Sequence, residues 1–426
     1  MTIPILYGHG SVPLDLPETC TATIIAKPPM PFLPEPRKAV AEALEHPASG
    51  AGLSELAGKA KSACILICDI TRPVPNGLFL RPIIETLLAA GIDAARIRVL
   101  VATGLHRPNL GGELRELVND DWVLRTVRVE NHDAHDTAAH ADLGTTASGT
   151  PVKIDRRFVE ADLKIATGLV EPHFMAGYSG GRKVISPGIA HEETIRTFHN
   201  TRFMENAAAR NCNFEGNPLH AEQLEIVRML GRVYAVNTCL DAERRLAFVN
   251  FGEILASHEA AVGFIRQYAE RPSAKRYRCV ITSAAGYPLD KSYYQTIKGI
   301  VGALGILEKG GSLLIASECG EGLGSPEFCE AQAALVEKGI DGFLAAARGR
   351  PLARVDEWQT VKLVEAVRDY RVHLYSARLL DEQTRLTGAT CHRDWGEAVA
   401  AVLRESGASE VAVIPEGPYV IPLCKR

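Results

Sequence analysis

The sequence predicts an α/β protein made of two domains. Its 426 residues suit two domains that each bury a core of their own. Short apolar runs recur along the chain, each followed by a polar loop marked by glycine or proline and then by helical periodicity, which is typical of parallel strands covered by helices. No apolar run approaches the roughly 18 residues of a membrane-spanning helix, so we expect a soluble, globular chain.

The first clear strand of the predicted sheet covers residues 63–68. This run is continuously apolar, as expected of a strand that is buried on both faces. A polar loop follows at 69–76. Apolar residues at helical spacing then predict a helix over 80–90, which ends at Gly91.

Two later strands repeat this plan. Residues 97–102 form one strand and precede a polar loop, and residues 163–166 form the other and lead into a glycine-rich segment. In open α/β sheets, ligands bind just beyond the carboxyl ends of the strands. The polar side chains that follow such ends are Asp69, Arg72, His106, His173 and Lys183. We therefore expect these side chains to share one site.

A second domain is predicted to begin near Arg271. Its expected elements are a strand over 279–282, a helix over 292–303, a strand over 312–316, helices around 328–337 and over 358–369, and strand-like stretches at 410–415 and 419–423. We predict a catalytic and cofactor-binding α/β domain over 1–270, on which segment 406–426 packs, and a closing α/β domain over 271–405. The active site is expected in the cleft between the two domains.

The stretch 167–200 is the most informative about function. It places His173, Lys183 and His199 around the glycine-dense turn 177–181. Imidazoles move protons or bind metals, and a lysine can hold a phosphate or attack a carbonyl once it is deprotonated. Glycines let the backbone approach a ligand closely. Structural needs alone rarely combine histidines, a lysine and a glycine-dense turn, so this stretch predicts an active site.

The glycine turn does not match a nucleotide-hydrolysing loop. A Walker A motif requires G-x-x-x-x-G-K-[ST], whereas here Arg182 precedes Lys183 and Val184 follows it. ATP hydrolysis is therefore disfavoured. The backbone N–H groups of such a turn are still suited to binding an anion.

Two histidines in equivalent loops favour proton transfer. His106 and His173 each follow a predicted strand, and an imidazole titrates close to neutral pH. Two imidazoles that face a substrate from opposite sides are what a stereochemical inversion requires, because one group must act on each face.

The sequence lacks the spacing of a protein-only metal site. His199 has no histidine four residues away, and no H-E-x-x-H motif is present, so a metal at His199 would need a cofactor to complete its coordination. The stretch 131–136 with His140 is dense in potential ligands but is interpreted as a solvated turn. The ten cysteines are scattered without a C-x-x-C motif, which predicts buried thiols of a cytosolic protein.

Charge and the N-terminal sequence exclude several classes of partner. The net charge is −4 with no sustained basic block, so neither nucleic acid nor an anionic membrane is expected to bind. The N-terminus lacks the basic start and long apolar stretch of a signal peptide, which predicts a cytoplasmic location.

One long motif resembles the signature of the lactate racemase family, whose enzymes use a nickel-pincer nucleotide. It consists of PHFMAGYSGGRK at 172–183, Pro187-Gly188, Thr194-Ile195 and His199. The resemblance extends to D-x-T-R-P at 69–73, G-L-H-R at 104–107, G-N-P at 216–218, G-Y-P-L-D at 286–290 and Y-Q-x-x-K at 294–298. These motifs lie in both predicted domains, so the resemblance covers essentially the whole chain.

The resemblance implies a covalent cofactor. It is pyridinium-3,5-bisthiocarboxylic acid mononucleotide, joined through a thioamide to a lysine that matches Lys183. Nickel would be held by the carbon and two sulfurs of the pincer and by His199, a donor set that suits square-planar Ni(II). The other positions implied to bind the cofactor are Asp69, Thr71, Gly177, Ser179, Gly180, Gly181, Tyr294 and Gln295.

The resemblance also implies a reaction. One of His106 and His173 would remove the hydroxyl proton of a 2-hydroxy acid while its Cα hydride passes to the cofactor. The hydride would return on the other face, and the second histidine would protonate the oxygen. Arg72, Lys298 and Trp358 match positions that contact the substrate. The expected function is a 2-hydroxy-acid racemase or epimerase, with lactate as the default substrate and cofactor-maturation enzymes as partners.

Two other functions remain open at this stage. The chain could store or deliver the nickel cofactor without turnover, in which case the two histidines would not matter. It could also be a nicotinamide-dependent dehydrogenase of 2-hydroxy acids. That function would require G-x-G-x-x-G after the first strand, and the loop 69–76 contains no glycine.

Overall fold

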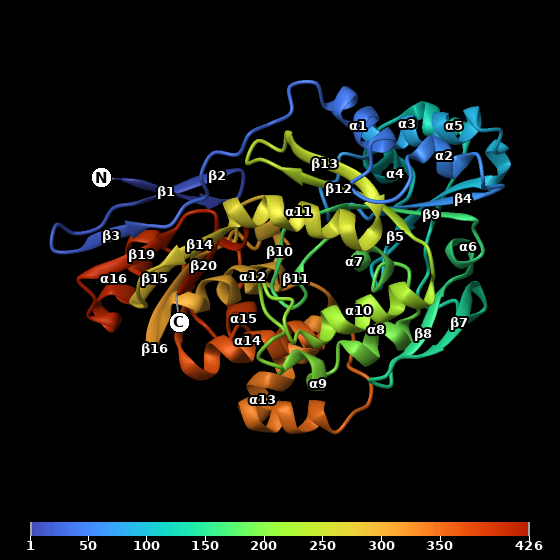
Figure 1. Ribbon diagram of the computed structural model, residues 1–426. Helices are drawn as coiled ribbons and strands as arrows, with labels where there is room; N and C mark the ends of the chain where they lie inside the picture. Colours follow the sequence, from blue (N-terminus) through green and yellow to red (C-terminus); the bar gives the residue numbers. More distant parts are fainter. Residues whose placement is uncertain (1, 425–426) are drawn as a thin grey trace. The chain divides into compact units, whose positions relative to one another are not determined.

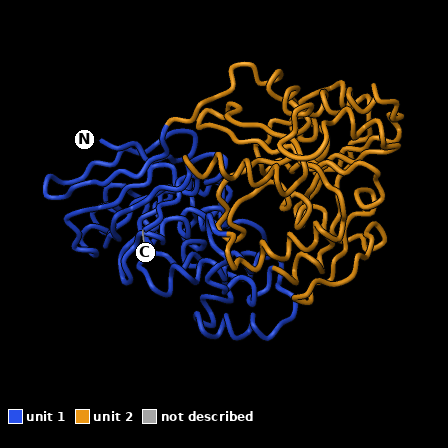
Figure 2. Tube along the Cα trace, in the orientation of Figure 1, with its two compact units in different colours: residues 1–28, 199–213, 268–426 blue, residues 29–198, 214–267 orange. Residues whose placement is uncertain are grey.

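A computed structural model describes residues 2–424 and divides them into two compact units. Unit 2, orange in Figure 2, comprises residues 29–198 and 214–267. Unit 1, blue in Figure 2, comprises the stretches up to Pro28, from His199 to Asn213 and from Tyr268 onwards. Each unit holds one six-stranded sheet with helices, so the predicted α/β class is confirmed (Figure 1).

The sheet of unit 2 has the strand order β13-β12-β9-β4-β5-β6. Its strands are β4 (Ala63–Cys68), β5 (Ile97–Ala102), β6 (Arg128–Asn131), β9 (Leu163–Leu169), β12 (Tyr234–Leu240) and β13 (Leu246–Glu253). All neighbours pair in parallel except β12 and β13, which are antiparallel. The three strands expected from continuous apolar runs are therefore present, and β4 lies between the other two.

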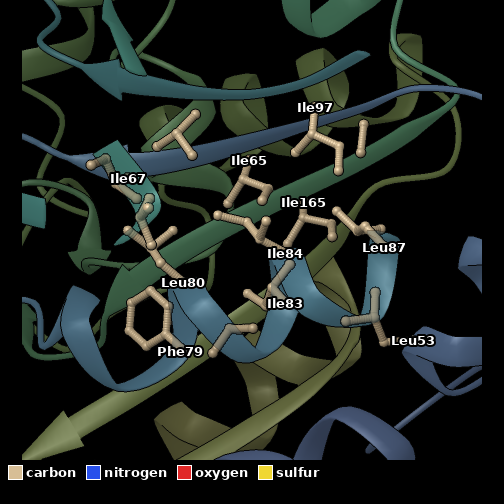
Figure 3. Close-up of a cluster of buried hydrophobic side chains, with 14 of the residues drawn as sticks. Leu53, Ile65, Ile67, Phe79, Leu80, Ile83, Ile84, Leu87, Ile97 and Ile165 are labelled. Atoms are coloured by element: carbon tan, nitrogen blue, oxygen red, sulfur yellow. The ribbon is translucent and has the colours of Figure 1, made fainter. Parts of the chain in front are cut away.

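Both faces of this sheet are covered. On one face, Ile65 and Ile67 of β4 pack with Phe79, Ile83 and other residues of α3 (Asn76–Ala89), as Figure 3 shows. On the other face, Leu66 belongs to a second buried cluster with side chains from α6, α7, α8 and α10. Each buried aliphatic side chain contributes on the order of 2 kcal/mol. Burial on both faces explains why β4 is apolar at every position.

The remaining elements of unit 2 surround this sheet. They are α1 (Pro36–Glu45), α2 (Leu53–Ala57), α4 (Gly111–Val118), α5 (Asp121–Thr126), β7 (His140–Thr145), β8 (Pro151–Asp155), α6 (Arg156–Val159), β10 (Pro172–His173), β11 (Gly177–Tyr178), α7 (Arg182–Ile185), α8 (Glu192–Phe198), α10 (Pro218–Met229) and α11 (Ile254–Ala269), with 3-10 turns at Ala94–Arg96 and Thr137–Ala139. The pairs β7–β8 and β10–β11 are antiparallel hairpins.

The sheet of unit 1 is parallel throughout, with the order β18-β17-β16-β15-β19-β3. Its strands are β3 (Thr21–Ile24), β15 (Tyr277–Ser283), β16 (Leu307–Ala316), β17 (Arg371–Tyr375), β18 (Thr390–His392) and β19 (Glu410–Ile414). The other elements are β1 (Ile3–Tyr7), β2 (Gly10–Leu14), α9 (Thr201–Met204), β14 (Glu270–Ser273), α12 (Tyr293–Ala303), α13 (Pro326–Arg348), α14 (Glu357–Asp369), α15 (Asp381–Thr384), α16 (Trp395–Ser406), β20 (Ile421–Cys424) and 3-10 turns at Leu289–Lys291, Leu304–Ile306 and Gly417–Tyr419.

The compact units differ from the predicted boundaries. We expected residues 1–270 to form one domain and segment 406–426 to pack on it. Instead β3 pairs with β19, β19 pairs with β15, and β20 pairs with β14, all within unit 1. The reason is that β19 lies inside the sheet and needs a partner on each edge, which β15 and β3 supply. Residues 199–213 also belong to unit 1.

No helix in the described stretch is long and apolar enough to cross a membrane.

Candidate active site

The carboxyl ends of β4 and β5 bring Asp69 and His106 into direct contact. His106 Nδ1 lies 2.5 Å from Asp69 Oδ2, and Asp69 Oδ1 accepts a hydrogen bond of 2.6 Å from the Thr71 hydroxyl. Burial alone would raise the pKa of Asp69, but the hydrogen bonds from His106 and Thr71 and the charge of Arg72 lower it below its usual value. Asp69 is therefore ionised at neutral pH, and His106 carries a hydrogen on Nδ1.

Arg72 follows Asp69 and pairs with Glu171. Its Nη1 lies 3.1 Å from Glu171 Oε1, and both side chains are mostly buried. Sequence reasoning singled out Arg72 but missed this carboxylate, which lies 99 residues away in the chain. A guanidinium has five N–H donors in a planar fork, a geometry that matches carboxylates and other anions.

His173 lies in the β10–β11 hairpin, where it pairs with Gly177. Its side chain is buried, and Nδ1 accepts N–H bonds from Met175 at 3.4 Å and Ala176 at 3.2 Å. A ring nitrogen that accepts cannot carry a hydrogen, so the neutral ring is protonated on Nε2. His106 and His173 thus have opposite tautomers.

The glycine turn has a backbone that only glycine adopts easily. Gly177, Gly180 and Gly181 have φ values of 79°, 76° and 47°. A Cβ on Gly180 would lie 2.6 Å from Val170, and a Cβ on Gly181 would lie 2.8 Å from His258. The turn therefore lies close against its surroundings.

Most polar groups of this turn are already bonded within unit 2. The Ser179 hydroxyl donates to Leu169 O and accepts from the Glu171 amide, so it anchors the turn. The amides of Tyr178, Ser179 and Gly181 donate to Ala176 O, Glu171 O and Asn237 Oδ1. Among residues 2–424, the buried amide of Gly180 meets no acceptor. Of these donors, the Gly180 amide is available for an anion.

Lys183 lies in α7 directly after this turn and is half-buried. Burial, together with the positive charges of Arg72 and Arg182, lowers the pKa of its ammonium to about 7. At neutral pH a large share of Lys183 is therefore the uncharged amine, which is the nucleophilic form.

Unit 1 groups a second set of the predicted residues. The His199 ring, which is buried, lies 4.9 Å from the ring of Trp358, measured between centroids. The Trp358 indole N–H donates to the Tyr294 hydroxyl at 3.3 Å, and on α12 the Lys298 ammonium donates to Gln295 Oε1 at 2.5 Å. His199, Trp358 and Tyr294 are thus in one contact chain, and Lys298 and Gln295 form a pair.

The ligand-rich stretch 131–140 is not the solvated turn that the sequence suggested. His135 is exposed, but His132 and His140 are buried. His132 Nδ1 lies 3.1 Å from Asp155 Oδ2, and its ring contacts that of His140 edge to face. The partner Asp155 lies on β8, which local sequence could not indicate.

Protein side chains alone do not assemble a metal site. No group of three or more His, Cys, Asp or Glu side chains suited to a metal ion occurs within residues 2–424.

Two family models match most of the chain. The model described as the lactate racemase N-terminal domain matches residues 7–211, and that of the lactate racemase C-terminal domain matches residues 273–422. A lactate racemase from Thermoanaerobacterium thermosaccharolyticum is 30% identical over 424 residues, which is 98% of this chain and 98% of that protein. A lactate racemase from Lactiplantibacillus plantarum is 29% identical over 392 residues, or 90% of each chain.

Solved structures agree with these matches. The lactate racemase apoprotein from Thermoanaerobacterium thermosaccharolyticum superposes with a TM-score of 0.92 at 29% identity, covering 99% of this chain and 100% of that one. A crystal structure from Thermotoga maritima has a TM-score of 0.68 at 18% identity over 91% of this chain and 98% of that one, and shows the fold alone.

Proposed function

This chain belongs to the lactate racemase family and is an isomerase, and on that premise we propose that it inverts C2 of a 2-hydroxy acid with the help of a nickel-pincer nucleotide. Lactate is the proposed substrate, because it is the substrate named for the two relatives. The inversion needs a proton acceptor and a proton donor for the substrate oxygen, and a group that takes up and returns the Cα hydride.

The observation that carries this proposal is the pair of opposite tautomers. His106 holds its hydrogen on Nδ1 against Asp69, so Nε2 is free of hydrogen in the neutral ring and suits a base. His173 holds its hydrogen on Nε2, which suits a donor. We propose that His106 accepts the hydroxyl proton and that His173 donates to the substrate oxygen.

With the opposite enantiomer these roles exchange. His173 must then accept a proton on Nε2, so its own hydrogen must lie on Nδ1 and the two amide contacts at 3.2 and 3.4 Å must break. The amides of Met175 and Ala176 are buried, so losing this acceptor costs about 1–3 kcal/mol for each amide left unsatisfied. The Asp69 carboxylate stays beside His106 in both directions of the proposed reaction.

The residues present fit the proposed cofactor. A large share of the Lys183 amine is uncharged at neutral pH, and a covalent attachment point requires this form. The Gly180 amide is a buried donor that is not paired within the described chain, which suits an anionic group of the nucleotide. His199 would supply the imidazole ligand to nickel. When bound, the group supplies the hydride acceptor that no side chain provides.

Two cations are proposed to hold the substrate carboxylate. They are Arg72 and Lys298, each already held by a partner, Glu171 and Gln295 respectively. An arginine fork suits a carboxylate, because it donates two parallel hydrogen bonds. Trp358 and Tyr294, which contact each other, are proposed as supporting walls near His199.

The test is to load the chain with its cofactor and follow inversion. The protein is co-expressed with cofactor-maturation enzymes, its intact mass and nickel content are measured, and single enantiomers of lactate and other 2-hydroxy acids are incubated with it. We expect a mass increase on Lys183, about one nickel per chain, and decay of optical rotation with lactate. Lys183→Ala is the matched control and should carry no adduct.

Two other outcomes would each contradict part of the proposal. An adduct and nickel without inversion of any 2-hydroxy acid would indicate a cofactor-storage protein. No adduct in material whose maturation enzymes load a control racemase would contradict the cofactor assignment.

A further inference from the structure

We propose that Arg182 is a positioning residue that fixes the glycine turn beside Lys183 and adds to the surroundings that favour the uncharged, nucleophilic form of the Lys183 amine. The inference rests on the proposed role of Lys183 as the attachment point. It concerns a residue that is absent from the predicted site and that makes no contact with a carboxylate in the described part of the chain.

The first observation is a buried charge that has no counter-ion. Arg182 is 1% exposed, and its Nε lacks a hydrogen-bond partner within the described chain. Its Nη2 donates to Ala176 O at 2.8 Å, and its Cζ lies 4.9 Å from the centre of the Phe214 ring. A carbonyl and an aromatic face stabilise a cation without cancelling its charge. Burial lowers the pKa of Arg182 to about 9, which leaves the guanidinium charged at neutral pH.

The second observation is that His258 completes a clamp on the turn. Its Nε2 lies 2.8 Å from Ser179 O and must donate, so Nδ1 is left as an acceptor toward Arg182 Nη1 at 3.4 Å. Burial and the charge of Arg182 hold the pKa of His258 well below its usual value, so the ring is neutral. Arg182 and His258 together bind the carbonyls of Ala176 and Ser179, which lie at either side of Gly177.

The clamp also explains the shape of the turn next to Lys183. Gly181 lies directly against the His258 ring, where a Cβ would approach to 2.8 Å. Arg182 and Lys183 then begin the short helix α7, whose residues Val184 and Ile185 are buried. The direction of the Lys183 side chain is therefore set by a backbone that Arg182 and His258 hold in place.

The third observation is the balance of charge around Lys183. Burial has the largest influence on the pKa of Lys183, and the charged or ionisable groups that act on it are, in decreasing order, Arg72, Cys68, Arg182 and Asp69. Cys68 is a neutral thiol, because burial raises its pKa to about 12. The carboxylate of Asp69 is shared with His106 and Thr71, and the charge of Arg72 is offset by Glu171. Arg182 is the cation of this set whose charge no carboxylate offsets.

This environment matters because only the free amine can attack an acyl group. A lysine with an ordinary pKa of about 10.4 is free at pH 7 in only about one molecule in several thousand. Burial disfavours the charged form and nearby cations add to this effect, so the reactive fraction rises by orders of magnitude.

The experiment measures the reactivity of Lys183 in protein without cofactor. Wild type, Arg182→Met and Arg182→Lys are pulse-labelled with acetic anhydride between pH 5.5 and 10.5, and acetylation of each lysine is quantified by peptide mass spectrometry. Lys309, which is exposed, serves as the internal standard in every sample. In wild type we expect Lys183 to reach half-maximal labelling near pH 7. In Arg182→Met the midpoint should rise measurably, and Arg182→Lys should stay close to wild type.

A second variant tests the proposal even if Arg182→Met misfolds. His258→Glu places a carboxylate facing Arg182, so it should raise the Lys183 midpoint while Arg182 stays in place. Circular dichroism identifies the folded variants. A wild-type midpoint that coincides with that of Lys309, or folded variants with an unchanged midpoint, would overturn the proposal.

This test separates the inference from the proposed function, because labelling needs neither cofactor nor turnover. Failure to find a cofactor adduct would leave the labelling result valid. If the cofactor adduct and the expected labelling are both found, loading of Arg182→Met by the maturation enzymes should be slow at pH 7 and recover at higher pH.

Discussion

At the scale of single residues, the two histidines of unit 2 differ in what their Nδ1 atoms contact. His106 Nδ1 donates to a carboxylate, whereas His173 Nδ1 accepts from two backbone amides. In the proposed reaction, Asp69 is therefore the residue that makes His106 a base. The carboxylate also stabilises the imidazolium that forms when His106 takes up a proton.

This role predicts a specific loss in Asp69→Asn. The amide keeps the size of the side chain but lacks the charge, and its N–H₂ group favours the wrong tautomer of His106. We expect kcat of the loaded enzyme to fall by about 10²- to 10⁴-fold, with the mass increase on Lys183 retained. Polarimetry gives the rate, and intact mass gives the loading.

Thr71→Val is the matched control for this change. It removes the 2.6 Å hydrogen bond to Asp69 Oδ1 but leaves the contact between Asp69 and His106. Its effect on kcat should stay within about tenfold. Equal losses in the two variants would show that the carboxylate has no special function toward His106.

The sequence indicated some of these residues and could not indicate others. His106 follows β5, and His173 and Lys183 lie in the segment that follows β9, so a rule about sheet edges finds them. No sequence pattern indicates that Arg182 is important, because an arginine next to a lysine usually lies on the surface. Its burial depends on Phe214 and on His258, which lies 76 positions away. Residues this distant in the chain give no local pattern.

At the scale of elements, the turn between β11 and α7 combines a special backbone with close packing. Gly181 has φ 47° and ψ −121°, and the ring of His258 blocks the space where a Cβ would stand. Gly231 offers a matched comparison, since it has φ 74° but open space within 4 Å of its Cβ position.

These two glycines should respond differently to alanine. Gly231→Ala meets only the backbone penalty, so we expect a loss of about 1 kcal/mol in unfolding free energy. Gly181→Ala adds a clash with His258 and should lose about 2–4 kcal/mol and fail to load cofactor on Lys183. Urea denaturation and intact mass measure the two effects. Similar losses in both variants would mean that the packing against His258 is unimportant.

The strands differ in how well the sequence predicts them. Strands β4, β5 and β9 are buried on both faces and are apolar at almost every position. Strands β1, β2 and β3 are short and contain few buried residues, so no apolar run marks them. The place of β3 in the sheet of unit 1 follows from pairing with residues about 390 positions later, which only the folded chain reveals.

At the scale of the whole molecule, unit 1 is built from three separate stretches of chain. The N-terminal stretch completes its core, because Ile3, Ile5 and Leu14 pack in a cluster with Val411 and Val413. It also supplies β3, which covers the edge of β19. The Gly8 amide donates to the fully buried carboxylate of Asp290 at 2.6 Å.

Removal of residues 2–28 should therefore unfold unit 1 selectively. Three buried aliphatic side chains at about 2 kcal/mol each amount to roughly 6 kcal/mol, which is comparable to the whole stability of a domain. The edge of β19 would be bare, and Asp290 would lose a donor. Hydrogen exchange read by peptide mass spectrometry should show loss of protection in β15, β16 and β19, with β4, β5 and β9 still protected. Ile5→Ala is the control and should cost about 2–5 kcal/mol while all six strands stay protected. Full protection of β15 and β19 in the shortened chain would show that unit 1 folds without its N-terminal stretch.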